Sequence, residues 1–295
     1  ILTSEYEPIL PREGKNFTLT INPNIQSKVE EILEKGVRNS RAKSGSAIIM
    51  DPKTGKIIAM ANYPTYNPSE YWRAGEAWIL KNRAISDVYE YGSVQKPITL
   101  AIGLETGAIQ KDFTCNDKTG FLDLYDATGY QDLKGQKVYT WNRRPAGFQD
   151  IADIFKNSNN PCTAQVALKV NSLEYYTYLR DFGIGEFIGI GLQHESTSYM
   201  KPFDYWTRLD IITSSYGQSI SATALQVLSA FSTFANNGIR MRPYIISQIS
   251  DEKETINIEP QVLSNPISKE VANTIRDNLK TAVLRNSLGG MAKGL

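Results

Sequence analysis

Residues 89–100 read Tyr-Glu-Tyr-Gly-Ser-Val-Gln-Lys-Pro-Ile-Thr-Leu, and this stretch decides how the chain is interpreted. Ser93 and Lys96 stand three residues apart, so a helix places both on one face and brings the amine to the hydroxyl. A serine is a weak nucleophile until a base takes its proton, and a lysine whose charge is disfavoured by burial is such a base. The apolar run at 98–104 predicts a buried helix over 93–105, with Pro97 loosening its first turn.

The Ser-x-x-Lys spacing by itself is weak evidence, because most such pairs are solvated. It recurs at Ser40, Ser198 and Ser250. Each of these serines stands in a polar stretch that is typical of a loop or turn. Only Ser93 follows a glycine and leads into an apolar helix, whose first N–H groups and positive end would lie beside the hydroxyl.

The composition excludes several classes of function. The 32 basic and 31 acidic residues nearly cancel, so nothing points to nucleic acid or to an anionic surface. The single histidine, His194, stands in a loop-like stretch, and a Ser-His-Asp triad would depend on it alone. No cluster of ligands predicts a metal, and we expect no cofactor. Cys115 and Cys162 are compatible with a disulfide and equally with two free apolar residues.

The 295 residues fit one large domain or two smaller ones. No apolar stretch reaches 18 residues, so we expect no membrane span in this chain. The polar, proline-bearing residues 1–16 predict a linker from a missing N-terminal region, and residues 17–295 predict a domain that is incomplete at its C-terminus. Both ends are interpreted as cuts through a longer protein.

The pattern along the chain mixes strands and helices. A hairpin is predicted by the apolar segments 46–50 and 57–61 on either side of a turn. Strands are predicted at 17–21 and 241–249. Helices are predicted at 25–37, 93–105, 149–158, 161–170, 172–182, 222–236 and 268–284.

A second motif follows an apolar helix. Ser158-Asn159-Asn160 is the only Ser-x-Asn in the chain. Alone it would indicate a turn or helix cap. Between two helices, however, the Ser158 hydroxyl would be able to relay a proton, and the Asn160 amide would be able to hold a peptide backbone.

With both motifs in place, the chain resembles the transpeptidase domain of a class B (monofunctional) penicillin-binding protein, most closely the septal, cell-division type. The matching segments occur in family order over almost the whole chain. They are residues 45–61, 82–87, the Ser93 motif, the Ser158 motif, 181–185 and 216–226.

The resemblance implies an α/β fold of the α+β type, with a central antiparallel sheet flanked by helices and a helical subdomain. It implies a peptidoglycan D,D-transpeptidase that cross-links stem peptides through a serine acyl-enzyme and is trapped by β-lactams. Ser93 would be the nucleophile, Lys96 its base, Ser158 a proton relay and Asn160 a substrate-binding residue. Division membrane proteins would be partners, and an N-terminal helix absent from this chain would anchor the parent protein at the extracytoplasmic face of the bacterial inner membrane.

Several positions depart from the family pattern. Tyr91 replaces a proline, Gln95 an aromatic or aliphatic residue, Ser219 a glycine and Ala224 a proline. No Lys-Thr/Ser-Gly motif follows the second motif on a predicted strand. Lys280-Thr281-Ala282 is a near match that lies within a helical pattern. The family's third motif comes just after a stretch like residues 289–295, so we expect the chain to stop before it and its acylation to be impaired.

Two other readings stay open. A β-lactamase-type hydrolase or a penicillin sensor would share Ser93 and Lys96. A non-catalytic module of the division complex would keep the fold without the chemistry, although the intact Ser93, Lys96, Ser158 and Asn160 argue against it.

Overall fold

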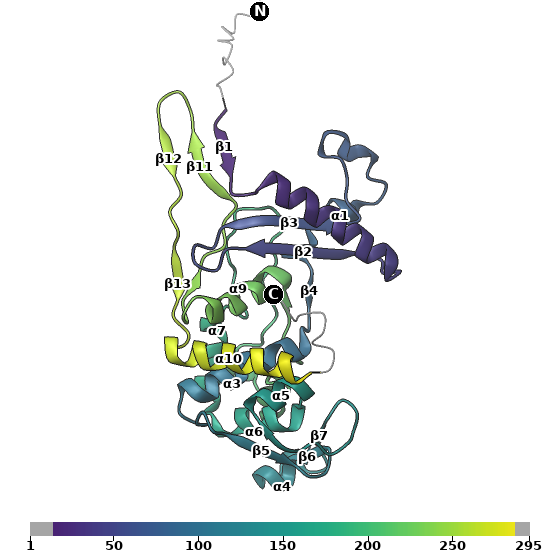
Figure 1. Ribbon diagram of the computed structural model, residues 1–295, viewed down its shortest axis with the longest axis vertical. Coiled ribbons are helices and arrows are strands. Elements are labelled where there is room, and N and C mark those ends of the chain that lie inside the picture. The colour runs from purple at the N-terminus through teal and green to yellow at the C-terminus, as the bar shows by residue number, and fades with distance from the viewer. Residues whose placement is uncertain (1–13, 287–295) are drawn as a thin grey trace, which may run out of the picture.

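The computed structural model describes residues 14–286. Figure 1 shows a hairpin and a long helix in the upper half, a helical body below them, and a small sheet that projects at the top. The projecting sheet has the order β1 (Asn16–Leu19), β11 (Ile246–Ser250) and β12 (Thr255–Asn257), with antiparallel pairing throughout.

The N-terminal layer consists of α1 (Pro23–Asn39) against the hairpin of β2 (Gly45–Met50) and β3 (Ile57–Tyr63). Asn22 caps α1 by accepting hydrogen bonds from two backbone N–H groups, and Pro23 occupies the first helical position. The hairpin pairs Ala47 with Ala61, and β3 buries alternate residues as a strand covered on one face does.

The helical body is built around α3 (Lys96–Glu105), most of which is buried. It packs against α6 (Asn160–Lys169), α7 (Ser172–Asp181), α5 (Ile151–Asn157) and α10 (Lys269–Arg285). The main apolar core lies between these helices and includes Ile98, Ile102, Val166 and Leu179. Helix α9 (Ala224–Ala235) lies between the hairpin and α10 in Figure 1, contacts both α10 and β2, and so joins the body to the hairpin.

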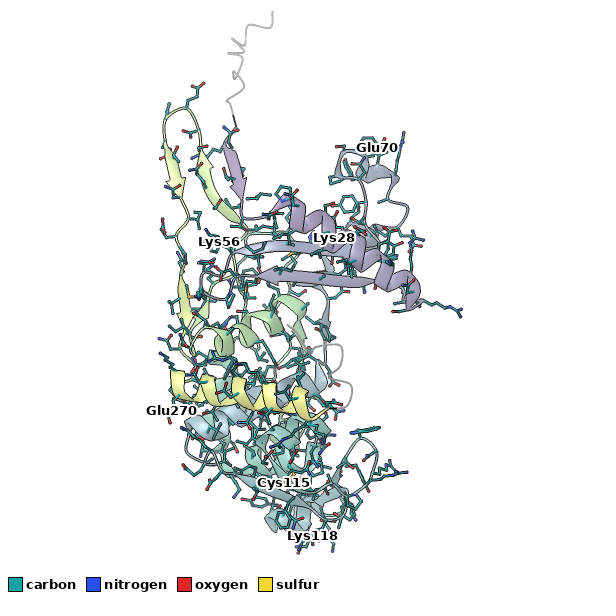
Figure 2. The ribbon with its side chains drawn as sticks, in the orientation of Figure 1. Lys28, Lys56, Glu70, Cys115, Lys118 and Glu270 are labelled. Carbon is teal, nitrogen blue, oxygen red and sulfur yellow. A yellow bond between two sulfur atoms is a disulfide. The ribbon has the colours of Figure 1, made fainter. Side chains whose placement is uncertain are left out.

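A small lobe extends below the helices (Figure 2). Its strands form two antiparallel pairs, β5 (Thr114–Asp117) with β8 (Gly147–Asp150) and β6 (Phe121–Asp123) with β7 (Lys137–Tyr139). A disulfide joins Cys115 in β5 to Cys162 in α6, which resolves the two alternatives left open by the sequence. Both cysteines are buried.

The remaining elements are short. The short α-helices are α2 (Arg83–Ser86), α4 (Leu124–Thr128) and α8 (Arg208–Ser214). Turns of 3-10 helix lie at Pro68–Arg73, Ala77–Leu80, Gly92–Gln95, Gln131–Leu133 and Phe203–Tyr205. Two further antiparallel pairs are β4 (Val88–Tyr89) with β9 (Ala222–Thr223), and β10 (Arg240–Met241) with β13 (Val262–Ser264).

Most predicted elements are confirmed, and three boundaries are wrong. The predicted helix 149–158 begins as strand β8, because residues 147–150 pair with β5, and becomes helical only at Ile151. The predicted helix 222–236 likewise begins as β9. The predicted strand 241–249 is two strands, β10 and β11, with only a single bridge from Tyr244 to Lys56 between them.

The α+β fold class is confirmed. Among residues 14–286, the hairpin β2–β3 has no third strand, so one edge of β2 is unpaired. The linker prediction falls mostly on residues outside the described range, as does the stretch 289–295.

Candidate active site

The Ser93 motif straddles a 3-10 turn and the start of α3. Gly92–Gln95 forms the turn and Lys96 opens the α-helix, so the predicted helix begins with a tighter first turn than an α-helix has. Lys96 Nζ lies 2.8 Å from Ser93 Oγ. Ser93 is exposed at the surface, whereas the Lys96 side chain lies beneath it and is 1 % exposed.

Ser158 completes a triangle with these two groups. Lys96 Nζ lies 2.7 Å from Ser158 Oγ and 2.9 Å from the Ser158 carbonyl oxygen. The two serine hydroxyls are 2.7 Å apart. The structure thus brings together three of the four residues that the sequence predicts, although they come from segments 62 positions apart in the chain.

The backbone at Ser158, whose hydroxyl contacts Lys96, is unusual. Helix α5 ends at Ser158, which adopts the left-handed conformation with a φ of 50°. Such a conformation is uncommon for a residue with a side chain and needs support from its surroundings.

Asn159 gives that support. Its side chain caps α6 by accepting a hydrogen bond from the Cys162 N–H at 2.9 Å and donates to Asp117 Oδ2, also at 2.9 Å. Asn159 and Asp117 are both buried. The Cys115–Cys162 disulfide ties the same two elements together, so β5 and α6 hold the Ser158 segment from both sides. Sequence reasoning missed Asn159 and Asp117, for which only the cap preference of asparagine was a signal.

Burial shapes the chemistry of Lys96. Desolvation lowers the pKa of Lys96 from the usual 10.5 to about 7, because the charged ammonium loses contact with water. In the described part of the chain Lys96 forms no ion pair that would restore the charge. Near neutral pH a large fraction of Lys96 is therefore an uncharged amine that can accept a proton from Ser93.

Asn160 lies apart from this triangle. Its side-chain amide donates to the carbonyl oxygen of Tyr139 at 3.0 Å, at the end of β7. It thereby attaches the small lobe to the start of α6. No hydrogen bond joins Asn160 to Ser93, Lys96 or Ser158 within the described residues. Its substrate-binding role stays a prediction.

The competing sequence signals lie elsewhere. His194 is an exposed loop residue. Lys201, of the Ser198 spacing, pairs with Asp210 at 2.8 Å. Lys280-Thr281-Ala282 lies inside α10, as expected. Two other stretches spell Lys-Ser/Thr-Gly: residues 43–45 lead into β2 and residues 53–55 form the β2–β3 turn, and no described hydrogen bond joins either to Ser93.

Within residues 14–286 no group of histidine, cysteine and carboxylate side chains is arranged to hold a metal ion. None of the helices there combines the length and the apolar character needed to cross a membrane.

The arrangement has the groups that serine acyl transfer requires. It contains an exposed hydroxyl, an amine of lowered pKa in hydrogen-bond contact with it, and a second hydroxyl that touches both. The N–H of Ser93 lies in a first helical turn, where N–H groups have no partner within the helix and are free to face an oxyanion.

Comparison with known proteins assigns most of the chain to a family. Residues 45–294 match the penicillin-binding protein transpeptidase domain. The chain belongs to this family. The matched range contains Ser93, Lys96 and Ser158.

Individual relatives are similar at moderate identity. Stage V sporulation protein D of Bacillus subtilis is 30% identical over 286 residues, which cover 95% of this chain and 42% of that protein. Penicillin-binding protein PbpB of Mycobacterium tuberculosis is 30% identical over 280 residues, covering 94% and 39%. Penicillin-binding protein 3 of M. tuberculosis in complex with aztreonam has a TM-score of 0.82 at 29% identity, covering 94% of this chain and 60% of that one. The chain spans about two fifths of the length of these curated relatives.

Proposed function

We propose that this transpeptidase domain is the catalytic part of a peptidoglycan D,D-transpeptidase. The observation that carries the proposal is the contact of one buried lysine, whose pKa burial lowers to about 7, with two serine hydroxyls, at 2.8 Å and 2.7 Å. Relatives with the names probable peptidoglycan D,D-transpeptidase PbpC and PenA support the same reaction.

The reaction follows from the geometry. Lys96 Nζ takes the proton of Ser93 as Ser93 Oγ attacks the carbonyl carbon of the D-Ala-D-Ala bond. The oxyanion faces the Ser93 N–H. Collapse breaks the peptide bond, and the proton passes from Lys96 through Ser158 Oγ to the departing D-alanine amine. In the second half, an amine of another stem peptide attacks the acyl-enzyme, its proton returns along the same path, and Ser93 is released with its proton.

Further parts of the proposal rest on the family resemblance. Asn160 would orient the stem peptide from the rim of the site, and a Lys-Thr/Ser-Gly strand beyond Leu295 would supply the second oxyanion donor. Residues 17–295 would be the incomplete transpeptidase domain and residues 1–16 a linker. The parent protein would be anchored in the inner membrane with this domain on the extracytoplasmic side, in contact with division proteins.

The first experiment is covalent labelling by a β-lactam, followed by intact and peptide mass measurement. We expect an adduct on Ser93 that is lost in Ser93→Ala, with Ser40→Ala as a matched control at another Ser-x-x-Lys position. The chain of residues 1–295 is compared with a chain extended through the third motif. Faster labelling of the extended chain supports an incomplete domain, whereas equal rates contradict it.

The same experiment separates the other readings. Rapid release of hydrolysed penicillin would favour a β-lactamase-type hydrolase over a transpeptidase. Absence of an adduct in both chains would favour a non-catalytic module of the division complex, and normal growth of cells that carry Ser93→Ala in the full-length protein would favour it further.

A further inference from the structure

A group of polar side chains is buried directly beneath the turn that carries Ser93. The group, called here the buried network, consists of Tyr91, Gln95, Thr99, Tyr175 and Ser215. Four of them are 0 % exposed and Tyr91 is 6 % exposed. Buried polar groups are costly unless each is hydrogen-bonded, so the pattern of donors and acceptors here is constrained.

The donor and the acceptor of each hydrogen bond in the buried network follow from the contacts. The Tyr91 hydroxyl donates to Gln95 Oε1 at 2.8 Å. Gln95 Nε2 donates to Thr99 Oγ1 at 3.3 Å and to the Tyr175 hydroxyl at 3.5 Å. Thr99 Oγ1 donates to the Ser215 carbonyl oxygen at 2.8 Å, so the Tyr175 hydroxyl is the donor in its 2.9 Å contact with Thr99. Within the described residues, Tyr91 is the donor that satisfies Gln95 Oε1.

The buried network attaches the Ser93 turn to one neighbouring segment, residues 215–219. Besides the bond from Thr99 to Ser215, the Gly92 N–H donates to the Gly217 carbonyl oxygen at 3.1 Å. The Ser219 N–H donates to Glu90 Oε1 at 2.8 Å. Gly217 has no room for a side chain, since a Cβ there would lie 2.1 Å from the Gly92 carbonyl oxygen. The turn is therefore held on its inner side, while Ser93 faces outward.

Tyr91 and Gln95 are the two positions at which this motif departs from the family pattern, and the structure shows that they are partners. A glutamine amide in a position that otherwise holds an apolar residue needs a donor for its oxygen, and Tyr91, four residues earlier, supplies it. Neither departure is explained alone. Together they replace apolar packing under the nucleophile by directional hydrogen bonds.

We propose that Tyr91 and Gln95 act as a pair of positioning residues that hold the Ser93 turn against residues 215–219 and so set the distance between Ser93 Oγ and Lys96 Nζ. The proposal rests on the proposed function, because its consequence is the rate at which Ser93 is acylated. Neither residue touches the substrate.

The test uses Tyr91→Phe, Gln95→Leu and the double variant Tyr91→Phe/Gln95→Leu in the full-length protein. The saturating rate of Ser93 acylation by a fluorescent penicillin is measured for each, per folded molecule. We expect about a tenfold loss of rate in all three variants, with unchanged half-saturation, since a small displacement of the reacting atoms lowers the rate without altering binding. The loss in the double variant should equal that in either single variant, because the pair acts as one unit.

Thermal stability separates positioning from a merely structural role. Tyr91→Phe leaves Gln95 Oε1 buried without a donor and should lower Tm, whereas the double variant removes both groups and should recover most of it. Slow acylation that persists in this stable double variant supports positioning. Recovery of the rate together with Tm, or losses that multiply, would overturn the proposal. Thr233→Val, which removes a buried hydroxyl bonded within α9, should lower Tm with no change in rate.

The titration of Lys96 gives a readout independent of acylation. Lys96 follows Gln95 directly, so a loosened turn should admit water and move the Lys96 pKa upward from about 7 toward its ordinary value. This is measured by NMR on isotopically methylated lysine in the wild-type protein and in the double variant. If the wild-type protein is not acylated at all, the proposed function fails. The positioning role is rejected separately if, in the double variant, the Lys96 pKa does not move and the distance between Ser93 Oγ and Lys96 Nζ does not change.

Discussion

At the scale of single residues, the chemistry depends on how one lysine is buried. Ser93 and Lys96 stand three residues apart, but a solvated pair with the same spacing would keep a charged amine. The pKa of Lys96 is lowered to about 7 because the side chain is packed beneath the turn and faces two hydroxyls rather than a carboxylate, so a large fraction is uncharged near neutral pH.

This burial predicts the pH dependence of acylation. The rate of Ser93 labelling by a β-lactam should rise with pH through a midpoint of about 7 and level off above it, since only the uncharged Lys96 accepts the proton. Stopped-flow labelling across pH 5–9 checks this. A rate that is still rising steeply at pH 9 would contradict the lowered pKa, and a rate independent of pH would mean that Lys96 is not the base.

The same burial predicts a change in stability. The pKa of Lys96 is lower in the folded than in the unfolded state, so between pH 7 and 10.5 the unfolded chain binds more protons and stability rises with pH. Lys96→Met should abolish acylation and remove this dependence. We expect its Tm to exceed that of the wild type most clearly below pH 7, with the difference shrinking toward pH 10. Parallel Tm–pH curves for the two proteins would contradict the assignment.

At the scale of secondary-structure elements, the site depends on where helices begin and end. Strand β8 and helix α5 carry the chain to Ser158, and α6 begins directly after it. The left-handed backbone at Ser158 is held by the Asn159 cap, by Asp117 and by the disulfide between β5 and α6.

Asn159→Ala should therefore lower both stability and activity. It removes the cap of α6 and leaves the buried Asp117 with one partner fewer, at a cost of about 2–3 kcal/mol. Chemical denaturation and penicillin labelling measure the two effects. Asn171→Ala, which removes the cap of α7, is the matched control and should lower stability with no change in labelling.

The disulfide predicts a larger effect. The cysteines are 47 residues apart, and a loop of that length gives about 4 kcal/mol in the chain-entropy account. Cys115→Ala/Cys162→Ala should lose stability up to that amount, measured by urea unfolding under non-reducing conditions. If the double variant and the reduced wild-type protein lose the same amount of stability, the effect belongs to the disulfide bond itself. If neither the double variant nor the reduced wild-type protein loses stability, the prediction is wrong.

At the scale of the whole molecule, one surface of the upper layer is uncovered in the described structure. An apolar groove of about 450 Å³ runs between α1 and β2, lined by Val29, Ile32, Leu33, Val37, Ala47 and Ile49. Ile32 is 59% exposed, and the adjoining edge of β2 has no partner strand among residues 14–286. Open strand edges and apolar surfaces of this kind are usually covered.

We expect residues beyond Leu295 to cover this surface, in line with the incomplete domain proposed above. A chain extended through the third motif should have a higher Tm, and the amide hydrogens of Gly45–Met50 should exchange more slowly in it. The amides of β12, at the far end of the projecting sheet, serve as an internal control and should not change. Equal exchange of β2 in both chains would contradict the prediction.

The sequence by itself determined the hairpin, the main helices and the Ser93–Lys96 pair, because each follows from a local pattern, whereas the fold class and the role of Ser158 were implied by the family resemblance. Asn22-Pro23 begins a helix, alternating or apolar runs make strands and helices, and a three-residue spacing brings Lys96 to Ser93. Tertiary structure decided the rest. Residues 147–150 and 222–223 became strands because partner strands were available, and backbone pairing overrode helical periodicity. The bond from Thr99 to Ser215, the bond from Asn159 to Asp117 and the burial that lowers the pKa of Lys96 arise between segments distant in the chain. There, packing excludes water and makes each unpaired polar group costly.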